Sequence, residues 1–213
     1  MSDLGRIGVL ISGRGSNMEA LAIACKEGLI RARIALVISN EPAAAGLARA
    51  HRHGIDTLVV DHRESPRREE HDRRLAEALD ARGCDLICLA GYMRLLSPWF
   101  VARYPNRIMN IHPSLLPSFP GLDAQKSAVE HGAKVSGVTV HFVDESVDHG
   151  PIIVQTAVSV HENDTPETLA ARILVEEHLA YPQAVRLFFE GRLRVEGRRV
   201  HVLAHEGTFD EPR

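Results

Sequence analysis

Short, almost wholly apolar segments recur along the chain, and each is followed by a stretch with helical spacing. They cover residues 6–11, 34–39, 57–60, 85–90 and 107–112. Strands that are apolar on both faces are typical of parallel sheets, because helices cover both sides of such a sheet. The alternation therefore predicts an α/β fold: a Rossmann-like sheet of mostly parallel strands with helices on both faces.

The helices are expected between these strands, with Pro42 in the first turn of the second one. A glycine follows several of the helical stretches, as is common just beyond a helix C-terminus. The expected helices cover about residues 18–26, 42–53, 69–82, 97–104, 124–130 and 164–190.

The pattern changes in the later part of the chain. Residues 137–143 alternate in the manner of a strand, and residues 152–160 form a second strand after a short loop. Two strands joined so closely are most simply antiparallel. Residues 193–203 predict a terminal hairpin that turns at Glu196-Gly197. Because no linker or repeat interrupts the chain, residues 1–213 are predicted to form a single domain.

Charge and apolar runs exclude several classes of function. The net charge is −3 with both signs interspersed, so neither a nucleic-acid footprint nor a polybasic membrane patch is expected. No apolar run approaches the roughly 18 residues of a membrane helix, and the N-terminus lacks the pattern of a signal peptide. Three cysteines make no disulfide framework, which fits a cytoplasmic protein. No HExxH or ordered Cys/His pair predicts a metal site.

The strand over 107–112 ends in two polar side chains that share one face, Asn110 and His112. Ligands bind at the carboxyl ends of strands in open α/β sheets. An imidazole can move a proton near neutral pH, and an amide can donate to an oxygen that gains negative charge. Ser114 lacks a GxSxG context, which favours direct transfer over a covalent enzyme intermediate. A polar pair that merely caps the strand is the alternative.

The turn after the first strand carries two glycines, Gly13 and Gly15. The backbone amides of residues 15–17 then lie at a helix N-terminus, which favours an anion. Met18 stands where the dinucleotide fingerprint requires its third glycine, and no Gly-Lys-Ser/Thr follows. The turn therefore predicts a site for one phosphate group, or else a purely structural turn in which Ser16 or Asn17 caps the helix.

Asp148 lies in the loop between the two late strands. If it approached His112, its carboxylate would stabilise the protonated imidazole. In isolation such a loop residue is more simply a solvated surface group. His141, on the strand before this loop, is expected to be a hydrogen-bonded structural histidine.

Several of these stretches together resemble one family. They are residues 11–17, 39–40, 90–97, 110–117 and 137–151, within a match over residues 6–190. They are similar to the glycinamide ribonucleotide transformylases, a branch of the folate-dependent formyltransferase superfamily. The resemblance implies transfer of a formyl group from 10-formyltetrahydrofolate, as co-substrate, to the amine of 5-phosphoribosylglycinamide in purine (IMP) biosynthesis. It implies no metal, and the oligomeric state is expected to be a monomer or a homodimer.

The same resemblance implies roles for individual residues. Asn110, His112 and Asp148 match the catalytic residues of the family. The half of the chain over about 1–105 is expected to bind the ribonucleotide and the half over about 106–190 to bind folate and carry the catalytic residues, followed by a hairpin over about 191–205. The residues that match the ribose-phosphate site are Gly15, Ser16, Asn17, Met18, Glu19 and Glu177. Those that match the folate pocket are Arg68, Met93, Arg94, Leu95, Leu96, Asn110 and Asp144.

Three positions depart from the family pattern. Arg14 separates the loop glycines where a small or uncharged residue is expected, and Gln125 stands where a histidine is expected. His149 replaces a small residue after Asp148, so a second imidazole there would alter the coupling between Asp148 and His112.

Other functions remain as alternatives. A 10-formyltetrahydrofolate hydrolase would use water as acceptor, but that relative carries an extra N-terminal domain. Methionyl-tRNA formyltransferase needs an RNA-binding domain and a basic surface. A non-catalytic nucleotide-binding module would need the phosphate loop alone, without the polar side chains of the catalytic group.

Overall fold

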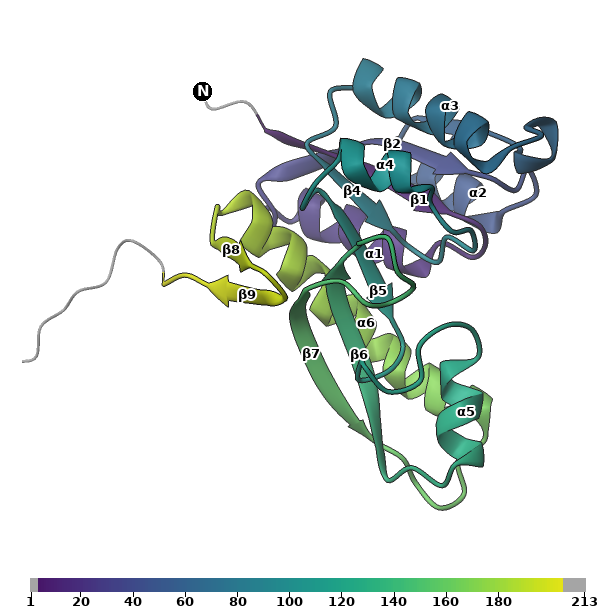
Figure 1. Ribbon diagram of the computed structural model, residues 1–213, viewed down its shortest axis with the longest axis vertical. Helices are drawn as coiled ribbons and strands as arrows, with labels where there is room; N and C mark the ends of the chain where they lie inside the picture. The colour runs from purple at the N-terminus through teal and green to yellow at the C-terminus, as the bar shows by residue number, and fades with distance from the viewer. Residues whose placement is uncertain (1–3, 205–213) are drawn as a thin grey trace, which may run out of the picture.

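A single nine-stranded sheet organises the chain, with strand order β3-β2-β1-β4-β5-β6-β7-β9-β8 (Figure 1). The computed structural model describes residues 4–204. The pairs among the first five strands are parallel, whereas β6 is antiparallel to both β5 and β7. The predicted α/β sheet, parallel first and antiparallel later, is confirmed.

The strands have the following bounds: β1 Gly5–Ile11, β2 Ala32–Ser39, β3 Thr57–Val59, β4 Leu86–Leu89, β5 Ile108–His112, β6 Val135–Phe142, β7 Ile152–Ser159, β8 Leu193–Glu196 and β9 Arg199–Val202. The helices are α1 Ser16–Lys26, α2 Ala45–Arg52, the 3-10 turn η1 His62–Glu64, α3 Arg68–Ala81, α4 Pro98–Arg103, α5 Ala124–Glu130 and α6 Pro166–Phe189.

Both faces of the inner parallel strands β1, β2 and β4 are buried, as their sequences predict, whereas the edge strand β3 is largely exposed. In β1, Val9 and Ile11 belong to the core that α1 and α6 cover, whereas Leu10 belongs to the core that α3 and α4 cover. These two pairs of helices lie on opposite faces of the sheet (Figure 1). Because apolar side chains leave water on both faces, near-continuous apolar strands are stable only in such a three-layer arrangement.

The order of the strands places a crevice at one edge of the sheet. β1 lies between β2 and β4, so the chain moves to one side of β1 first and to the other side afterwards. In open α/β sheets, ligands bind outside the carboxyl ends of the strands at such a point. The turn after β1 and the ends of β4 and β5 therefore lie at the same end of the sheet.

Two local predictions are wrong. Pro42 precedes the second helix, which begins at Ala45, because the start of this helix is set by packing: a Cβ on Gly46 would lie 3.1 Å from the Gly13 carbonyl oxygen and from Gly15 Cα. In addition, neither Ser16 nor Asn17 caps α1. The N-cap is Gly15, with φ 73° and no side-chain hydrogen bond, and the Asn17 amide binds another helix instead.

The terminal hairpin of β8 and β9 forms as predicted, and it also joins the main sheet. β9 runs parallel to β7, with Arg199 opposite Ile152. The tip of the hairpin therefore lies at the start of β7 (Figure 1). Its pairing partner could not be read from the sequence, because the contact is made between distant segments.

Candidate active site

The C-terminal end of β5 presents Asn110 and His112 to one cavity. The intervening Ile111 packs in the opposite face of the sheet with Met109, as the period of a strand requires. His112 is 4% exposed. Ile108, two residues before Asn110, anchors the strand because it is buried against α3 and α4. The two polar side chains are thus held by a rigid strand.

Asp148 reaches back from the loop after β6 to this pair. Its Oδ2 lies 3.3 Å from His112 Nδ1 and accepts a hydrogen bond of 2.8 Å from the Gly121 amide. Its Oδ1 accepts from Asn110 Nδ2 at 3.3 Å. The structure therefore brings the three residues matched to the family's catalytic group into one cluster, and Asp148 is not a solvated surface residue.

The Asp148 carboxylate remains ionised in this setting. Burial alone raises the pKa of a carboxyl group, but the contact with the His141 ring, the hydrogen bond from the Gly121 amide and the nearby His112 outweigh it and hold the pKa of Asp148 below its usual value. Asp148 is therefore an acceptor and a negative charge beside the imidazole over the whole neutral range.

His141 joins this cluster, which the sequence did not predict. It is hydrogen-bonded as expected: Nδ1 donates to the Phe142 carbonyl at 2.8 Å. That bond leaves Nε2 as an acceptor for Asn110 Nδ2, 3.2 Å away. The available signal was the strand pairing, because Asn110 and His141 stand directly opposite each other in β5 and β6. His141 thus helps to orient the Asn110 amide.

The loop after β5 supplies the remaining contact of His112. Its Nε2 donates to the Phe119 carbonyl at 2.8 Å. A buried polar group holds this loop to the sheet: Thr139 Oγ1 donates to the Ser114 carbonyl at 2.7 Å and accepts from the Leu116 amide at 3.1 Å. The imidazole is thus fixed between the loop and Asp148.

A cavity of about 680 Å³ opens beside the cluster. Leu89, Leu96 and Val143 contribute apolar walls, and residues 144–148 form one rim. All the residues matched to the family's folate pocket line this cavity, namely Arg68, Met93, Arg94, Leu95, Leu96, Asn110 and Asp144, and so does Gln125. An apolar cavity with a few polar groups is typical of small-molecule sites.

Within residues 4–204, two arginines of this cavity make no hydrogen bond or ion pair, although both lie near enough to Asp72 to interact with its charge. The Nε of Arg94 is buried and makes no hydrogen bond. Within residues 4–204, Arg68 makes no hydrogen bond or ion pair. A buried donor without an acceptor costs about 1–3 kcal/mol, so a ligand that supplies an acceptor would recover that cost.

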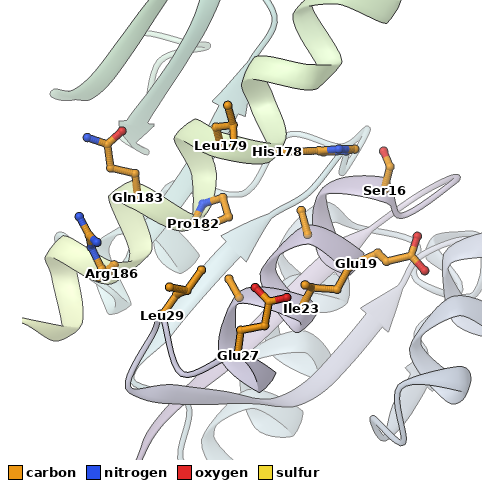
Figure 2. Close-up of a pocket in the computed structure, with 12 residues that line it drawn as sticks. Ser16, Glu19, Ile23, Glu27, Leu29, His178, Leu179, Pro182, Gln183 and Arg186 are labelled. Carbon is orange, nitrogen blue, oxygen red and sulfur yellow. The ribbon is translucent and has the colours of Figure 1, made fainter.

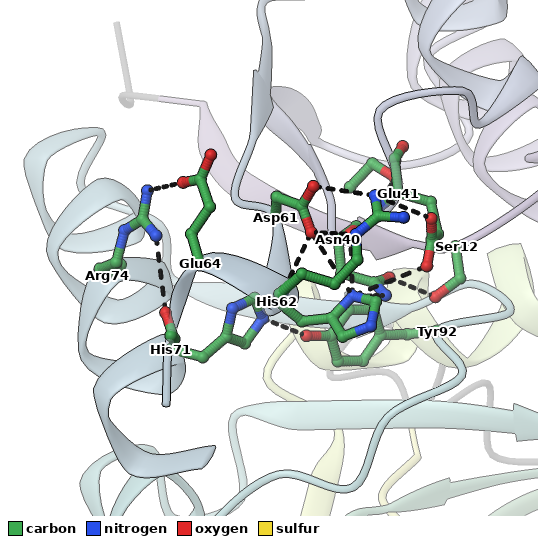
Figure 3. Close-up of polar contacts among 12 residues, drawn as sticks. Ser12, Asn40, Glu41, Asp61, His62, Glu64, His71, Arg74 and Tyr92 are labelled. Carbon is green, nitrogen blue, oxygen red and sulfur yellow. Dashed lines mark hydrogen bonds and ion pairs between the residues drawn. The ribbon is translucent and has the colours of Figure 1, made fainter. Parts of the chain in front are cut away.

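A polar network at the ends of β1 and β2 holds the cavity segment that follows β4 (Figure 3). Ser12 Oγ donates to Asn40 Oδ1 at 2.5 Å and accepts from the Met93 amide at 2.8 Å. On the neighbouring segment, Tyr92 Oη lies 2.9 Å from His71 Nε2. These contacts fix the backbone from which Arg94 and its neighbours project.

The turn after β1 presents the N-terminus of α1. A Cβ on Gly15 would lie 2.7 Å from Gly46 Cα, so only glycine fits here. Asn17 Nδ2 donates to Glu177 Oε2 at 2.6 Å, while the buried Asn17 Oδ1 has no partner. Burial raises the pKa of Glu177, although the Asn17 bond and Arg14 oppose the shift. Arg14 itself is exposed.

The other two residues matched to the ribose-phosphate site differ from these. Met18 is fully buried, so only its backbone amide can face a ligand. The Glu19 carboxylate is bound by Arg49 and by His53. Glu19 and Ser16 also border an apolar pocket of about 600 Å³ between α1 and α6 (Figure 2).

His149 does not adjoin the Asp148 carboxylate, contrary to expectation. Its Nδ1 lies 2.7 Å from Asp144 Oδ2, and Arg198 Nη1 lies 2.9 Å from Nδ1 and 2.6 Å from Nε2. Asp148 has φ 48°, which directs consecutive side chains apart. The extra imidazole therefore contacts Asp144 and Arg198 and not the Asp148 carboxylate.

The sequence profile of the family described as Formyl transferase matches residues 5–185. The chain belongs to the formyl transferase family. It is 43% identical to phosphoribosylglycinamide formyltransferase of Escherichia coli (strain K12) over 187 residues, which cover 88% of each chain. The crystal structure of glycinamide ribonucleotide transformylase 1 from Symbiobacterium toebii superposes with a TM-score of 0.94, at 57% identity and 96% coverage of each chain.

A longer relative also matches this chain. The trifunctional purine biosynthetic protein adenosine-3 of Drosophila melanogaster is 50% identical over 188 residues, which are 87% of this chain and 14% of that protein. This chain therefore spans a small part of that relative.

Neither metal ligation nor a membrane span is found in the described part of the chain. Within residues 4–204, no group of three or more His, Cys, Asp or Glu side chains is arranged to hold a metal ion. None of the helices there is long and apolar enough to cross a membrane.

Proposed function

We propose that this chain transfers the formyl group of 10-formyltetrahydrofolate to the amine of 5-phosphoribosylglycinamide, a step of de novo purine (IMP) biosynthesis. The cluster of Asn110, His112 and Asp148 carries this proposal, because it borders the large cavity at a strand end. The names of the E. coli and S. toebii relatives support it. The match between this chain and a small part of the Drosophila purine biosynthetic protein is consistent with the same step.

The folate co-substrate fits the cavity beside this cluster. A pterin is flat and needs an apolar slot, which Leu89, Leu96 and Val143 offer. A folate also ends in carboxylates, for which the unpaired Arg68 and Arg94 are suitable partners. Net attraction at that end does not require a metal, because arginine binds carboxylates directly.

The ribonucleotide fits the N-terminus of α1. A phosphate would accept from the backbone amides of Gly15, Ser16 and Asn17, where the helix dipole favours negative charge. Glu177 would accept from a ribose hydroxyl, because Asn17 occupies only one of its carboxylate oxygens. The exposed Arg14 adds positive charge near the same turn.

Each residue of the cluster has a task in the transfer. The folate supplies an electrophilic formyl carbon, and a new C–N bond to the glycinamide amine replaces the bond to the folate nitrogen. Asn110 donates an N–H to the formyl oxygen as negative charge develops there. Its present bonds, 3.2 Å to His141 and 3.3 Å to Asp148, are long enough to be exchanged.

His112 donates from Nε2 to the same oxygen, which takes the place of the Phe119 carbonyl. Asp148 holds Nδ1 and stabilises the positive charge of the ring when both nitrogens are protonated. The proton released by the attacking amine moves to the leaving nitrogen with the help of this pair and water. His141 acts as a positioning residue, because it touches Asn110 and not the reacting atoms.

One assay distinguishes the proposal from its alternatives. Protein, 10-formyltetrahydrofolate and 5-phosphoribosylglycinamide are mixed, and tetrahydrofolate release is followed with each component omitted in turn. The proposal expects release only when both small molecules are present. Release without the ribonucleotide would identify a hydrolase, whereas ribonucleotide binding without any release would identify a binding module.

The enzyme is proposed to act in the cytoplasm on small molecules, as a monomer or a homodimer. The three cysteines are free thiols, which fits a reducing compartment. The division into a ribonucleotide-binding half over about 1–105 and a folate-binding half over about 106–190 stays a prediction. Both proposed sites draw on distant segments, since Asn17 binds Glu177 and Arg68 lines the cavity that Asp148 closes.

A further inference from the structure

The loop between β6 and β7 has little freedom at its ends. Asp148 adopts φ 48°, a left-handed conformation that is strained for a residue other than glycine. At Gly150 a Cβ would lie 1.8 Å from the Phe142 carbonyl oxygen, so the backbone is in close contact there. Such a conformation persists only where the surroundings hold it. The contacts that hold this loop therefore matter for the position of Asp148.

The tip of the terminal hairpin supplies such contacts. Arg198 Nη2 donates to the His149 carbonyl at 2.8 Å, and Arg198 Nη1 lies 2.6 Å from His149 Nε2. His149 Nδ1 in turn lies 2.7 Å from Asp144 Oδ2. The chain Arg198-His149-Asp144 thus runs from the hairpin to the far end of the same loop.

The His149 ring is held by two charged neighbours. Arg198 Nη1 lies near both ring nitrogens, 2.9 Å from Nδ1 and 2.6 Å from Nε2. Asp144 Oδ2 lies 2.7 Å from Nδ1. These contacts give the imidazole a fixed direction across the loop.

The tip of the hairpin is itself paired with the sheet. β9 pairs with the first residue of β7, with Arg199 opposite Ile152. Arg198 therefore projects from a short hairpin joined to the sheet just after the loop. The side chains of Asp144 to Asp148 form a rim of the large cavity, so this contact lies behind a wall of the proposed folate site.

We propose that Arg198 and His149 are positioning residues that hold the 144–148 loop in the shape required for folate binding. The inference rests on the proposed function for its substrate. Neither side chain touches the reacting cluster; both act through the loop backbone and Asp144. The C-terminal hairpin is then a part of the folate site and not only an edge of the sheet.

Kinetics of Arg198→Met test this role. The variant keeps the aliphatic stem and loses the donors to His149. Both lost contacts lie near the surface, so we expect KM for 10-formyltetrahydrofolate to rise about three- to tenfold. KM for the ribonucleotide should stay unchanged, because α1 and Glu177 are far from the hairpin contact. Arg198→Lys, which keeps the charge but has a single donor nitrogen, should recover part of the loss.

Arg199→Met is the matched control. Arg199 is exposed on the same hairpin and loses the same charge, so an electrostatic effect alone would change both variants equally. His149→Ala removes the ring and with it the side-chain contacts to Asp144 and Arg198. Because both residues act in one chain of contacts, Arg198→Met with His149→Ala should be less harmful than the product of the two single effects.

Hydrogen exchange separates this inference from the proposed function. Amides of residues 144–150 should exchange several-fold faster in Arg198→Met than in the unchanged protein or in Arg199→Met. Equal exchange in the two arginine variants, or equal changes in the KM of both substrates, would overturn the positioning role. If exchange is faster in Arg198→Met but the unchanged protein shows no formyl transfer, the structural role of Arg198 would stand and the proposed function would be rejected.

Discussion

The cluster at the end of β5 and the two binding regions beside it satisfy their polar groups differently. Asn110, His112 and Asp148 all bond to protein groups, with His141, Phe119 and Gly121 as further partners. In the binding regions, Asn17 Oδ1 and Arg94 Nε are buried without partners. The polar groups of the cluster find their hydrogen-bond partners within the protein, whereas those of the binding regions find all their partners only when a ligand is bound.

This difference has a physical meaning. Groups that must hold each other in a fixed geometry gain by bonding within the protein, since the geometry then exists before the substrate arrives. Groups that recognise a ligand gain by staying unpaired, because the ligand alone then recovers the cost of their burial. Variants of the first group should therefore lower kcat, and variants of the second should raise KM.

The largest effect is expected for His112→Ala. Loss of a positioned proton donor should lower kcat by about a thousandfold, while ribonucleotide binding, measured by calorimetry, should stay nearly unchanged. Asp148→Asn keeps the shape and should lower kcat less. His51→Ala, a change to an exposed histidine on α2, is the control. Retained turnover in His112→Ala would contradict the role assigned to His112. It would also contradict the distinction between the catalytic cluster and the binding regions.

Glu177→Gln should give the next largest effect. A lost hydrogen bond between a ribose hydroxyl and a charged group should raise KM for the ribonucleotide about tenfold or more, with kcat little changed. The neighbouring Glu176→Gln is the control.

The same variant has a second readout in stability. Burial raises the pKa of Glu177, so the folded protein prefers the protonated acid. The stability from this preference is present below the unfolded pKa of 4.5 and is lost as pH rises through the folded pKa. Glu177→Gln should therefore raise Tm at neutral pH relative to the unchanged protein. A lower Tm at pH 7 would show that the carboxylate is structural.

A smaller change in KM is expected for Arg94→Met. The variant removes a donor without a partner in the protein, so KM for 10-formyltetrahydrofolate should rise about three- to tenfold. Thermal unfolding should show no loss of stability, because no hydrogen bond of Nε is broken. Arg52→Met, on the exposed side of α2, is the control. An equal rise in KM for the ribonucleotide would show that Arg94 does not act specifically in the folate-binding region.

The smallest effect is expected for His71→Phe combined with Tyr92→Phe. Burial, with added repulsion from Arg94, lowers the pKa of His71 from 6.5 to about 4. The unfolded chain therefore binds a proton at higher pH than the folded one, and the stability present above pH 6.5 is lost as pH falls toward 4. Removing both partners leaves no unpaired hydroxyl, so the stability at pH 7 should change little.

Denaturant unfolding between pH 4 and pH 7 measures this effect. The double variant should lose less stability on acidification than the unchanged protein. An identical pH dependence in both proteins would mean that His71 is not held neutral by its surroundings.

Most of the fold was predictable from local sequence patterns. Continuous apolar strands predicted the parallel sheet, because only burial on both faces stabilises them, and alternation predicted the antiparallel pair β6 and β7. The capping of α1 was wrong, since Asn17 bonds to Glu177 on α6. The start of α2 was wrong because packing against Gly13 and Gly15 decides it.

For the site, strand periodicity placed Asn110 and His112 on one face, and a resemblance to a family singled out Asp148. Contacts between residues far apart in the sequence could not be predicted. The contact of His141 with Asn110 follows from strand register, and that of His149 with Arg198 follows from the pairing of β9 with β7. Neither register is written in the local sequence.

The sequence by itself therefore determined the layers of this protein, the glycine turn before α1 and the chemistry at the end of β5. Periods of two and 3.6 residues and glycine geometry act over a few neighbours, and a short segment contains them fully. The tertiary structure alone decided which polar groups are satisfied. Whether a buried atom finds a partner depends on segments that meet only after folding, and that distinction separates the self-complete cluster from the sites left open for ligands.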